Sequence, residues 1–308
     1  MFQKISIINM KELDNIKVSQ LRLIQLLQLK LLLEAKRITS ELNIDYFLVA
    51  GSLLGSIRHG GFIPWDSDAD IAMLREDYTT LIKNTSVVGS EFFLQCDETD
   101  KFNRTGFAKL RLKDTLYIEK GNVENGLSNG FYIDIFPLDN HVKRNKYLNV
   151  FSHKLYKYLI RLKAYKNGKV RSSTKYRTIL SAIICFPSFF ISLKSIIRLH
   201  NKISQSYKNK ETGYVNNFNS KYGLEKQLIS LETYLPASET DFEGHKFKAP
   251  NQIDQWLTKI YGDYNVLPKK QIDHTHGLMK NYAINFGKYS SLLGKPETEV
   301  IKKLRIQP

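Results

Sequence analysis

The chain has 308 residues, 42% of them apolar, including 17 Tyr and 17 Phe. This length allows one elaborate domain or two small ones, and the apolar content excludes an intrinsically disordered chain. With 46 basic and 30 acidic residues the net charge is +16, which favours polyanionic partners such as nucleic acid, anionic lipid or phosphorylated substrates. A biased base composition of the genome is an alternative source of the excess Lys.

The two cysteines and the N-terminus point to an intracellular protein. Cys96 and Cys185 lack CxxC spacing, so we expect neither a disulfide framework nor a structural zinc site. The leucine-rich stretch 18–33 is interrupted by Gln20, Arg22, Gln25, Gln28 and Lys30, and no small-residue cleavage site follows it. It therefore does not resemble a secretory signal, and we predict a cytoplasmic location.

The N-terminal half alternates predicted helices and strands. Residues 11–42 predict a largely buried helix, because helix formers dominate and Pro and Gly are absent. A buried strand over 45–50 then enters a turn at Gly51-Ser52, and a helix over 52–59 ends at Gly60-Gly61. Further strands are expected over 71–74, 92–96, 106–112, 115–118 and 131–136, the last stopped by Pro137, with a helix over 75–83 and a loop over 122–129. This pattern predicts an α+β (α/β) domain over 11–142.

The C-terminal part, 143–308, is predicted to be a helical and mixed region that packs on this core and contacts the acceptor or a membrane. Helical spacing continues to Lys169, and residues 179–193 are nearly all apolar, with Pro187 in the middle and basic flanks. That run is shorter than the roughly 20 residues of a spanning helix. Three interpretations stay open: a buried helical hairpin, insertion into the interface of an anionic membrane, and a true span.

Two short motifs are typical of phosphate chemistry. Gly51-Ser52 follows a strand and precedes a helix, where backbone N–H groups and the hydroxyl can bind phosphate, although most Gly-Ser turns are only turns. Asp68 and Asp70 lie two residues apart on an extended segment, so their carboxylates project to one side and suit Mg²⁺. A solvated acidic turn is the alternative.

Two further acids strengthen the metal hypothesis. Asp66 lies close to the Asp68/Asp70 pair, and Asp134 is the lone acid in an apolar strand. A carboxylate in such a strand is costly unless it is paired or bound to a metal. A salt bridge to Lys or Arg is one interpretation of Asp134, and a third metal ligand on a neighbouring strand is the other.

The order Gly51-Ser52, Asp68-x-Asp70 and Asp134 resembles the DNA polymerase beta-like nucleotidyltransferases. Residues 51–66 (GSLLGSIRHGGFIPWD) resemble the LicD family, which includes bacterial phosphocholine transferases and, more distantly, fukutin-type ribitol-phosphate transferases. Other matching segments are Arg75-x-Asp77-Tyr78, residues 133–139 and residues 261–268 with the later His274 and His276. The family usually has Asp-Asp-Asp-Ile-Asp after the tryptophan, whereas this chain has Asp-Ser-Asp-Ala-Asp.

The resemblance implies a nucleotidyltransferase-like mixed sheet core with flanking helices. It also implies an enzyme that uses Mg²⁺, with Mn²⁺ as an alternative, to transfer a phospho-alcohol from a CDP-alcohol, CDP-choline being the first choice. The acceptor would be a hydroxyl of a cell-surface glycan or lipid-linked glycan, of the lipopolysaccharide, teichoic acid or capsule type. We expect no nucleic-acid partner. We do expect a peripheral contact with the anionic inner face of the membrane.

The same resemblance assigns roles to individual residues. The catalytic and metal-binding set is Asp68, Asp70 and Asp134. The substrate-binding set is Gly51, Ser52, Arg58, His59, Trp65, Lys109 and Arg111. For these cations, for His59 and for Trp65, ordinary structural roles are the alternatives.

Three other functions stay open: a sugar-nucleotide glycosyltransferase whose Asp-x-Asp binds manganese, a true nucleotidyltransferase, and a non-catalytic basic module that binds membrane or nucleic acid.

Overall fold

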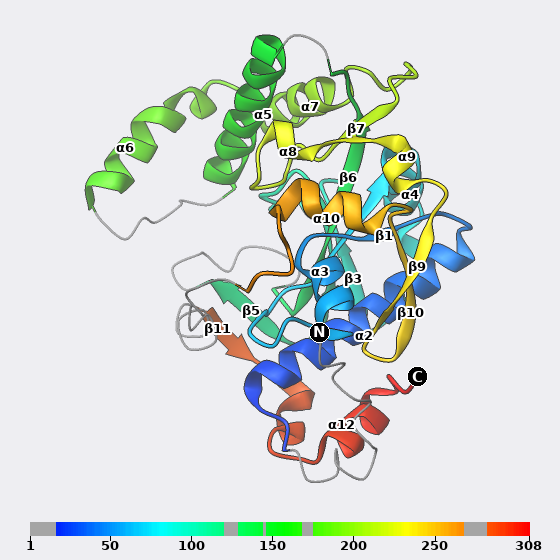
Figure 1. The fold of residues 1–308 in the computed structure, drawn as a ribbon. Coiled ribbons are helices and arrows are strands. Elements are labelled where there is room, and N and C mark those ends of the chain that lie inside the picture. The colour runs from blue at the N-terminus through cyan, green and yellow to red at the C-terminus, as the bar shows by residue number, and fades with distance from the viewer. Residues whose placement is uncertain (1–16, 120–128, 144–145, 168–174, 268–281) are drawn as a thin grey trace.

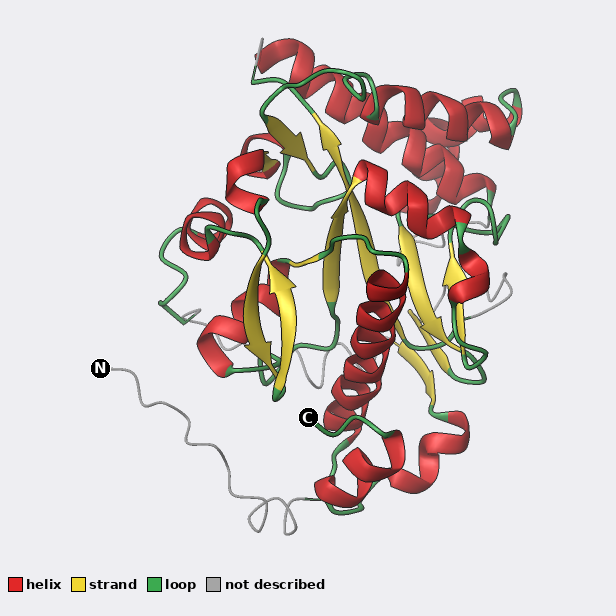
Figure 2. Cartoon of the chain, turned by 90° about the vertical axis from the view of Figure 1, so that its right-hand side faces the viewer, coloured by secondary structure: helices red, strands yellow, loops and turns green. Residues whose placement is uncertain are grey.

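The computed structural model describes residues 17–119, 129–143, 146–167, 175–267 and 282–308. The predicted helix over 11–16, most of the loop over 122–129, and His274 and His276 lie outside these residues. Figures 1 and 2 show a central sheet with helices α5–α7 gathered at one end and helix α12 near the other.

The central sheet has seven strands and mixed direction, as predicted. Its strands are β1 (Phe47–Leu48), β2 (Asp70–Leu74), β6 (Tyr132–Asn140), β4 (Ala108–Leu112) and β3 (Phe92–Gln95), in that order, with β7 (Tyr214–Asn216) and β8 (Leu228–Ser230) added beside β6. Strands β2 and β6 pair in parallel, whereas the other pairs are antiparallel. Two small sheets accompany it: β5 (Leu116–Glu119) with β11 (Tyr282–Asn285), and β9 (Ser238–Phe242) with β10 (His245–Ala249).

Helices flank the sheet and complete the α+β fold. They are α2 (Gln20–Glu41), α3 (Ala50–His59), α4 (Arg75–Lys83), α5 (Lys146–Lys166), α6 (Lys175–Cys185), α7 (Leu193–Ser204), α8 (Leu224–Gln227), α9 (Leu231–Tyr234), α10 (Ile253–Tyr261) and α12 (Glu297–Leu304), with short 3₁₀ turns that include η2 (Phe186–Phe189). Helix α2 is largely buried, as predicted, and packs on β4 and β6.

The main hydrophobic core draws on both halves of the chain. Strand residues such as Ile71 and Ile135 belong to the same buried cluster as Val215, Trp256 and Val300. A second, small cluster contains only Leu159, Leu162, Cys185 and Ile196 among the described residues, all in α5–α7. The C-terminal part therefore packs on the N-terminal core, while the division at residue 142 stays a prediction.

The first helix and the first strand differ from their predicted bounds. Helix α2 begins at Gln20, because the Ser19 hydroxyl accepts a hydrogen bond from the Arg22 N–H and caps the helix, so residues 17–19 of the predicted helix lie outside it. Strand β1 has two residues, and α3 begins at Ala50. Gly51-Ser52 therefore lies in the first turn of α3 and not before it.

Strand β6 runs through Pro137, so the prediction that this proline ends the strand was wrong. Residues 132–135 pair with β4, and residues 139–140 pair with β7. Between these stretches β6 is paired only with β2, where Pro137 lies opposite Met73. A proline, which lacks an N–H, is tolerated where one side of a strand is unpaired.

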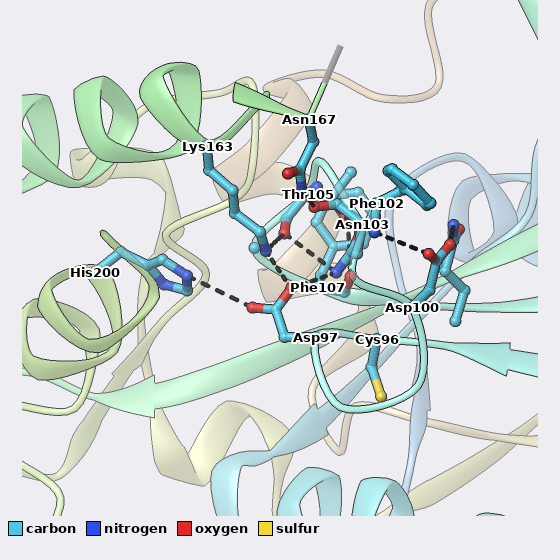
Figure 3. A network of polar contacts seen from close by, with 12 residues as sticks. Cys96, Asp97, Asp100, Phe102, Asn103, Thr105, Phe107, Lys163, Asn167 and His200 are labelled. Carbon is cyan, nitrogen blue, oxygen red and sulfur yellow. Dashed lines mark hydrogen bonds and ion pairs between the residues drawn. The ribbon is translucent and has the colours of Figure 1, made fainter. Parts of the chain in front are cut away.

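Helices α5–α7 form a layer that a buried polar network joins to the core. Lys163 of α5, whose side chain is 0% exposed, forms an ion pair with Asp97 and donates to the Thr105 carbonyl (Figure 3). His200 of α7 lies with Nε2 3.7 Å from the other Asp97 oxygen, and Asn103 donates to Asp97 at 2.9 Å. One acid thus connects two helices of the layer to the loop after β3.

The apolar run 179–193 forms the end of α6, η2 and the start of α7. Among the described residues no single helix is long and apolar enough to span a membrane; the pair 179–189 and 193–204 reaches the required length and composition only together, and it is bent by 95°. The buried-hairpin interpretation is wrong, because Ile183, Phe186, Phe189 and Phe190 are exposed.

Candidate functional site

The parallel pairing of β2 with β6 brings the predicted acids together. Asp70 and Asp134 lie directly opposite each other in the register, and Asp68 immediately precedes β2. On the other side of β6, Lys109 lies opposite Asp134 and forms an ion pair with it. The Ser52 hydroxyl accepts a hydrogen bond from the Asp70 N–H at 2.9 Å, which ties α3 to the start of β2.

Burial and mutual repulsion dominate the electrostatics of this cluster. Burial, together with the charge of Asp68, raises the pKa of Asp66 to about 8. Burial also raises the pKa of Asp70 well above its ordinary value, with the charges of Asp68, Asp134 and Asp66 adding to the effect. Burial raises the pKa of Asp134 as well, although the Lys109 ammonium opposes that shift. Such a cluster is stabilised by protonation or by a bound cation.

Two buried glutamines of α2 hold the acidic segment in place. Gln25 donates its side-chain amide to the Asp66 carbonyl at 2.9 Å, and Gln28 donates to the Ser67 carbonyl at 2.7 Å. In the sequence these residues are only polar breaks in a leucine-rich helix. Their amides fix the backbone from which Asp66 and Asp68 project.

The start of α3 is closely packed against the same segment. Ala50 has φ 50°, a conformation that costs a non-glycine residue about 1 kcal/mol or more. A Cβ on Gly51 would lie 2.5 Å from Asp66 Oδ2. A Cβ on Gly55 would lie 2.3 Å from the Gly61 carbonyl oxygen, which is backbone and cannot yield easily. Glycine at 51 and 55 therefore lets the helix approach the acids.

The acids open into a cavity of about 610 Å³, large enough for a nucleotide-sized ligand. One wall comes from α3, the segment before β2, β2 itself and β6, and it includes Gly51, Trp65, Asp68, Asp70 and Asp134. The opposite wall comes from the segment after β7 and from α10. Its residues include Asn217, Asn219, Ser220, Lys221, Tyr222 and Tyr261.

The structure places the predicted substrate-binding residues unequally. Gly51 and Trp65 line the cavity. The Ser52 hydroxyl and the Lys109 ammonium are bonded to Asp70 and Asp134, at the edge of the acidic cluster. Gly51, Ser52 and Lys109 thus lie beside the acids, and their roles toward phosphate stay predictions.

The remaining predicted cations, Arg58 and Arg111, do not line the cavity. Arg58 donates to the Tyr264 carbonyl at 3.2 Å and to His59 Nε2 at 3.1 Å. Arg111 is buried and donates to Gln95 at 2.6 Å and to the Gly130 carbonyl at 2.8 Å. The structural interpretation therefore fits Arg111 best, and Arg58 and His59 do not line the cavity.

Sequence reasoning missed the opposite wall of the cavity. Tyr222 and Tyr261 are in edge-on contact, with ring centroids 5.5 Å apart, and burial raises the pKa of Tyr261. Lys221 faces the acids closely enough to oppose the pKa shift of Asp66. The single signal for this wall was the resemblance of residues 261–268, which did not single out these side chains.

The charge of the acidic cluster suits a divalent cation, but its side chains are not already arranged as metal ligands. Within the described ranges, no three His, Cys, Asp or Glu side chains already lie in a metal-binding arrangement. Asp70 nevertheless lies among three other carboxylates, with the Lys109 ammonium bound to Asp134 rather than to Asp70. Asp68 and Asp70 are the residues best placed to hold a cation, whereas Asp134 is paired with Lys109 and its role as a metal ligand stays a prediction.

Comparison with known proteins agrees with this geometry. Residues 43–164 match the LicD/FKTN/FKRP nucleotidyltransferase domain. The chain is 27% identical over 248 residues to lipopolysaccharide cholinephosphotransferase LicD of Haemophilus influenzae, covering 79% of this chain and 90% of that one. It is 51% identical over 35 residues to human ribitol 5-phosphate transferase FKRP, covering 11% of this chain and 7% of that one. Residues 43–164 therefore form a nucleotidyltransferase domain of the LicD family, and the acids of β2 and β6 lie within it.

Proposed function

We infer that the chain is a phosphotransferase that modifies a cell-surface glycan, and we propose that it transfers a phospho-alcohol from a CDP-alcohol to a glycan hydroxyl. Phosphocholine from CDP-choline is the first choice, because the relative that matches over most of the chain is a cholinephosphotransferase. The observation that carries the proposal is the register of β2 with β6, which sets Asp70 beside Asp134 at a nucleotide-sized cavity.

Mg²⁺ is the proposed cofactor, with Mn²⁺ as an alternative. Asp68 and Asp70 would hold it, and it would neutralise charge on the donor diphosphate. The pKa shifts of Asp66 and Asp70 support a cation here, since a buried group of carboxylates repels itself without one.

In the proposed reaction the acceptor hydroxyl oxygen forms a bond to the phosphorus that carries the alcohol. The bond from that phosphorus to the bridging oxygen breaks, and CMP leaves with that oxygen. Asp134 is the candidate to take the hydroxyl proton, because burial raises its pKa and so favours its protonated form. Lys109, which holds Asp134 in position, would then lose its partner and could face the departing phosphate.

The aromatic lining supports a quaternary ammonium as the transferred group. Trp65, Tyr132, Tyr222 and Tyr261 all line the cavity, and Tyr132 already contacts the Lys109 ammonium, 3.6 Å from the ring centroid. Choline is recognised by such aromatic faces. Glycerol and ribitol would gain much less from them.

A donor screen tests the proposal. The purified chain would be incubated with Mg²⁺, a cell-envelope glycan fraction and, in parallel, CDP-choline, CDP-glycerol, CDP-ribitol and UDP-sugars. We expect CMP release from CDP-choline alone, and none from an Asp68→Asn protein. Release of UDP with transfer of a sugar would instead identify a glycosyltransferase.

Binding of the metal can be measured separately from turnover. Mg²⁺ at about a hundred times its Kd should raise the free energy of unfolding by about 2.7 kcal/mol. The same addition should leave the melting temperature of an Asp68→Asn/Asp70→Asn protein unchanged. An equal shift in both proteins would place the cation elsewhere.

A further inference from the structure

The positive charge of this protein is concentrated in one segment. Residues 140–210, which include the whole of helices α5–α7, contain 17 Lys and Arg and no Asp or Glu. The other 237 residues contain 29 basic and 30 acidic residues, which leaves them at −1. A general compositional bias would spread the excess along the chain. The net charge of +16 is therefore a property of the helical layer.

The same layer exposes most of the large apolar side chains on the surface. Eleven of the fourteen exposed large apolar residues in the described parts of the chain belong to it, including Phe189, 68% exposed, and Phe190, 77% exposed. With Phe186 they form a cluster on and after η2, in which the ring centroids of Phe186 and Phe190 are 5.3 Å apart. Exposed apolar clusters of this kind mark binding surfaces.

Basic side chains border the exposed rings. Lys166 donates to the Ser188 carbonyl at 2.7 Å, and Arg161 donates to the Ser181 hydroxyl at 2.9 Å, so both are held beside α6 and η2 by neutral groups. Lys194 and Arg198 on α7 are also exposed. An apolar cluster bordered by cations, in a segment whose sequence has no acid, is complementary to anionic headgroups over acyl chains.

Helix α5 connects this surface to the catalytic cavity. On its buried side Tyr156 donates to Asn219 at 2.9 Å, and Lys157 donates to the carbonyls of Asn219 and Ser220 at 2.9 and 3.0 Å. Asn219 and Ser220 line the cavity. On its exposed side α5 carries Phe151, 65% exposed. One helix thus contacts the cavity wall with one face and presents the basic, apolar surface with the other.

We propose that the α5–α7 layer docks on an anionic lipid bilayer, with Phe186, Phe189 and Phe190 inserted at the interface and the basic side chains on the headgroups. No helix needs to cross the bilayer in this arrangement. The cavity then lies over the membrane surface, where a lipid-linked glycan would present its hydroxyl. That last step rests on the proposed function, whereas docking itself does not.

Vesicle flotation tests the proposal with the full chain. The probes are vesicles of phosphatidylcholine alone and vesicles with about a third phosphatidylglycerol. We expect binding to the anionic vesicles, weakened by raised salt because the basic contacts are screened. A Phe189→Ser/Phe190→Ser protein should bind about tenfold to a hundredfold less, since two rings lose their apolar contact.

The matched control is Val266→Ser/Leu267→Ser, which removes two exposed apolar side chains outside the layer and should bind like the wild type. Both variants should keep the melting temperature and the CMP release of the wild type with a delipidated acceptor. Failure of the wild type to bind anionic vesicles at low salt would overturn the proposal, as would equal binding by the Phe variant. If the wild type formed a stable dimer and did not bind vesicles, and if the Phe variant were monomeric, the surface would instead bind a second copy of the chain.

Discussion

Two regions of this protein carry opposite charge: the acidic site at β2 and β6, here called the sheet end, and the basic helical layer α5–α7. Around β2 and β6, Asp66, Asp70 and Asp134 are half-buried beside the exposed Asp68. Burial and the neighbouring carboxylates raise the pKa of these three acids, and Lys109 is the cation paired with Asp134. In residues 140–210, which include α5–α7, 17 basic residues occur without one acid, and large apolar side chains are exposed. We propose that the first region receives a cation and a phosphate, and that the second receives an anionic surface.

The two regions also differ in what holds them together. The sheet end shares the main core with residues as distant as Val300. The layer has a small core of its own and depends on Asp97, which Lys163 and His200 both approach. Perturbing the acids should therefore alter chemistry and spare the fold, whereas perturbing Asp97 or Lys163 should loosen the layer.

The largest expected effect is on turnover. Asp70→Asn should lower phosphotransfer about a thousandfold or more, because a cation ligand is lost. The melting temperature should stay the same or rise, since the substitution removes a buried carboxylate that its neighbours repel. Activity assays and calorimetry measure both, with Asp241→Asn on the exposed part of β9 as the control. Loss of stability alongside activity would indicate a structural acid.

The second effect is on the stability of the layer. Lys163→Met should lower the free energy of unfolding by about 3–5 kcal/mol, because Asp97 would remain as a partly buried charge without its cation. The double variant Lys163→Met/Asp97→Asn should recover part of that loss. Urea unfolding measures it, and hydrogen exchange should show α5–α7 opening before the sheet. An unchanged unfolding curve would show that the network does not join layer and core.

A smaller effect is expected from pH. Burial lowers the pKa of His153 on α5 from 6.5 to about 4, with Lys157 and His141 adding to the shift. The unfolded chain therefore binds this proton first as the pH falls, so stability is complete above pH 6.5 and declines toward pH 4. Because the group is partly solvated, the loss should be about 1 kcal/mol. Melting curves of His153→Phe, which keeps a ring against Phe218, should decline less over this range.

The smallest effect concerns the start of α3. Ala50→Gly should stabilise the protein by up to about 1 kcal/mol, because Ala50 has a positive φ that glycine adopts without strain. Turnover should be unchanged, since no side-chain contact to the acids is altered. Gly51→Ala is the contrasting variant: its Cβ would meet Asp66 and should lower turnover. Equal turnover in both would mean that the approach of α3 is not needed.

The acids that the sequence singled out do lie together, because the evidence for them is local, while their catalytic and metal-binding roles stay predictions. Asp68 and Asp70 are two residues apart, and the lone acid in an apolar strand marked Asp134. The register that sets Asp70 opposite Asp134 is a long-range pairing, which no spacing in the sequence could show. The end of the strand at Pro137 was mispredicted for the same reason. A proline is tolerated in β6 because β4 and β7 pair with other parts of that strand, and the local sequence does not show this.

The opposite wall of the cavity and the exposed surface of the helical layer could not be predicted from local sequence patterns. Lys221, Tyr222 and Tyr261 become site residues only because the chain returns past β6. Lys109 and Arg111 lie two residues apart on β4 and so project to the same side of the strand. Arg111 is nevertheless bonded to Gln95, and Lys109 to Asp134. The apolar run 179–193 had three interpretations because periodicity cannot tell a buried face from one that binds lipid.

Doubly labelled CDP-choline tests the central claim most directly, with one label in the choline and another in the cytidine. In the presence of Mg²⁺ and the glycan fraction, the choline label should appear on the glycan and the cytidine label in free CMP, in the wild type and not in Asp70→Asn. A cytidine label on the glycan would contradict the account, since it would mean that the acids beside β6 direct attack at the other phosphorus.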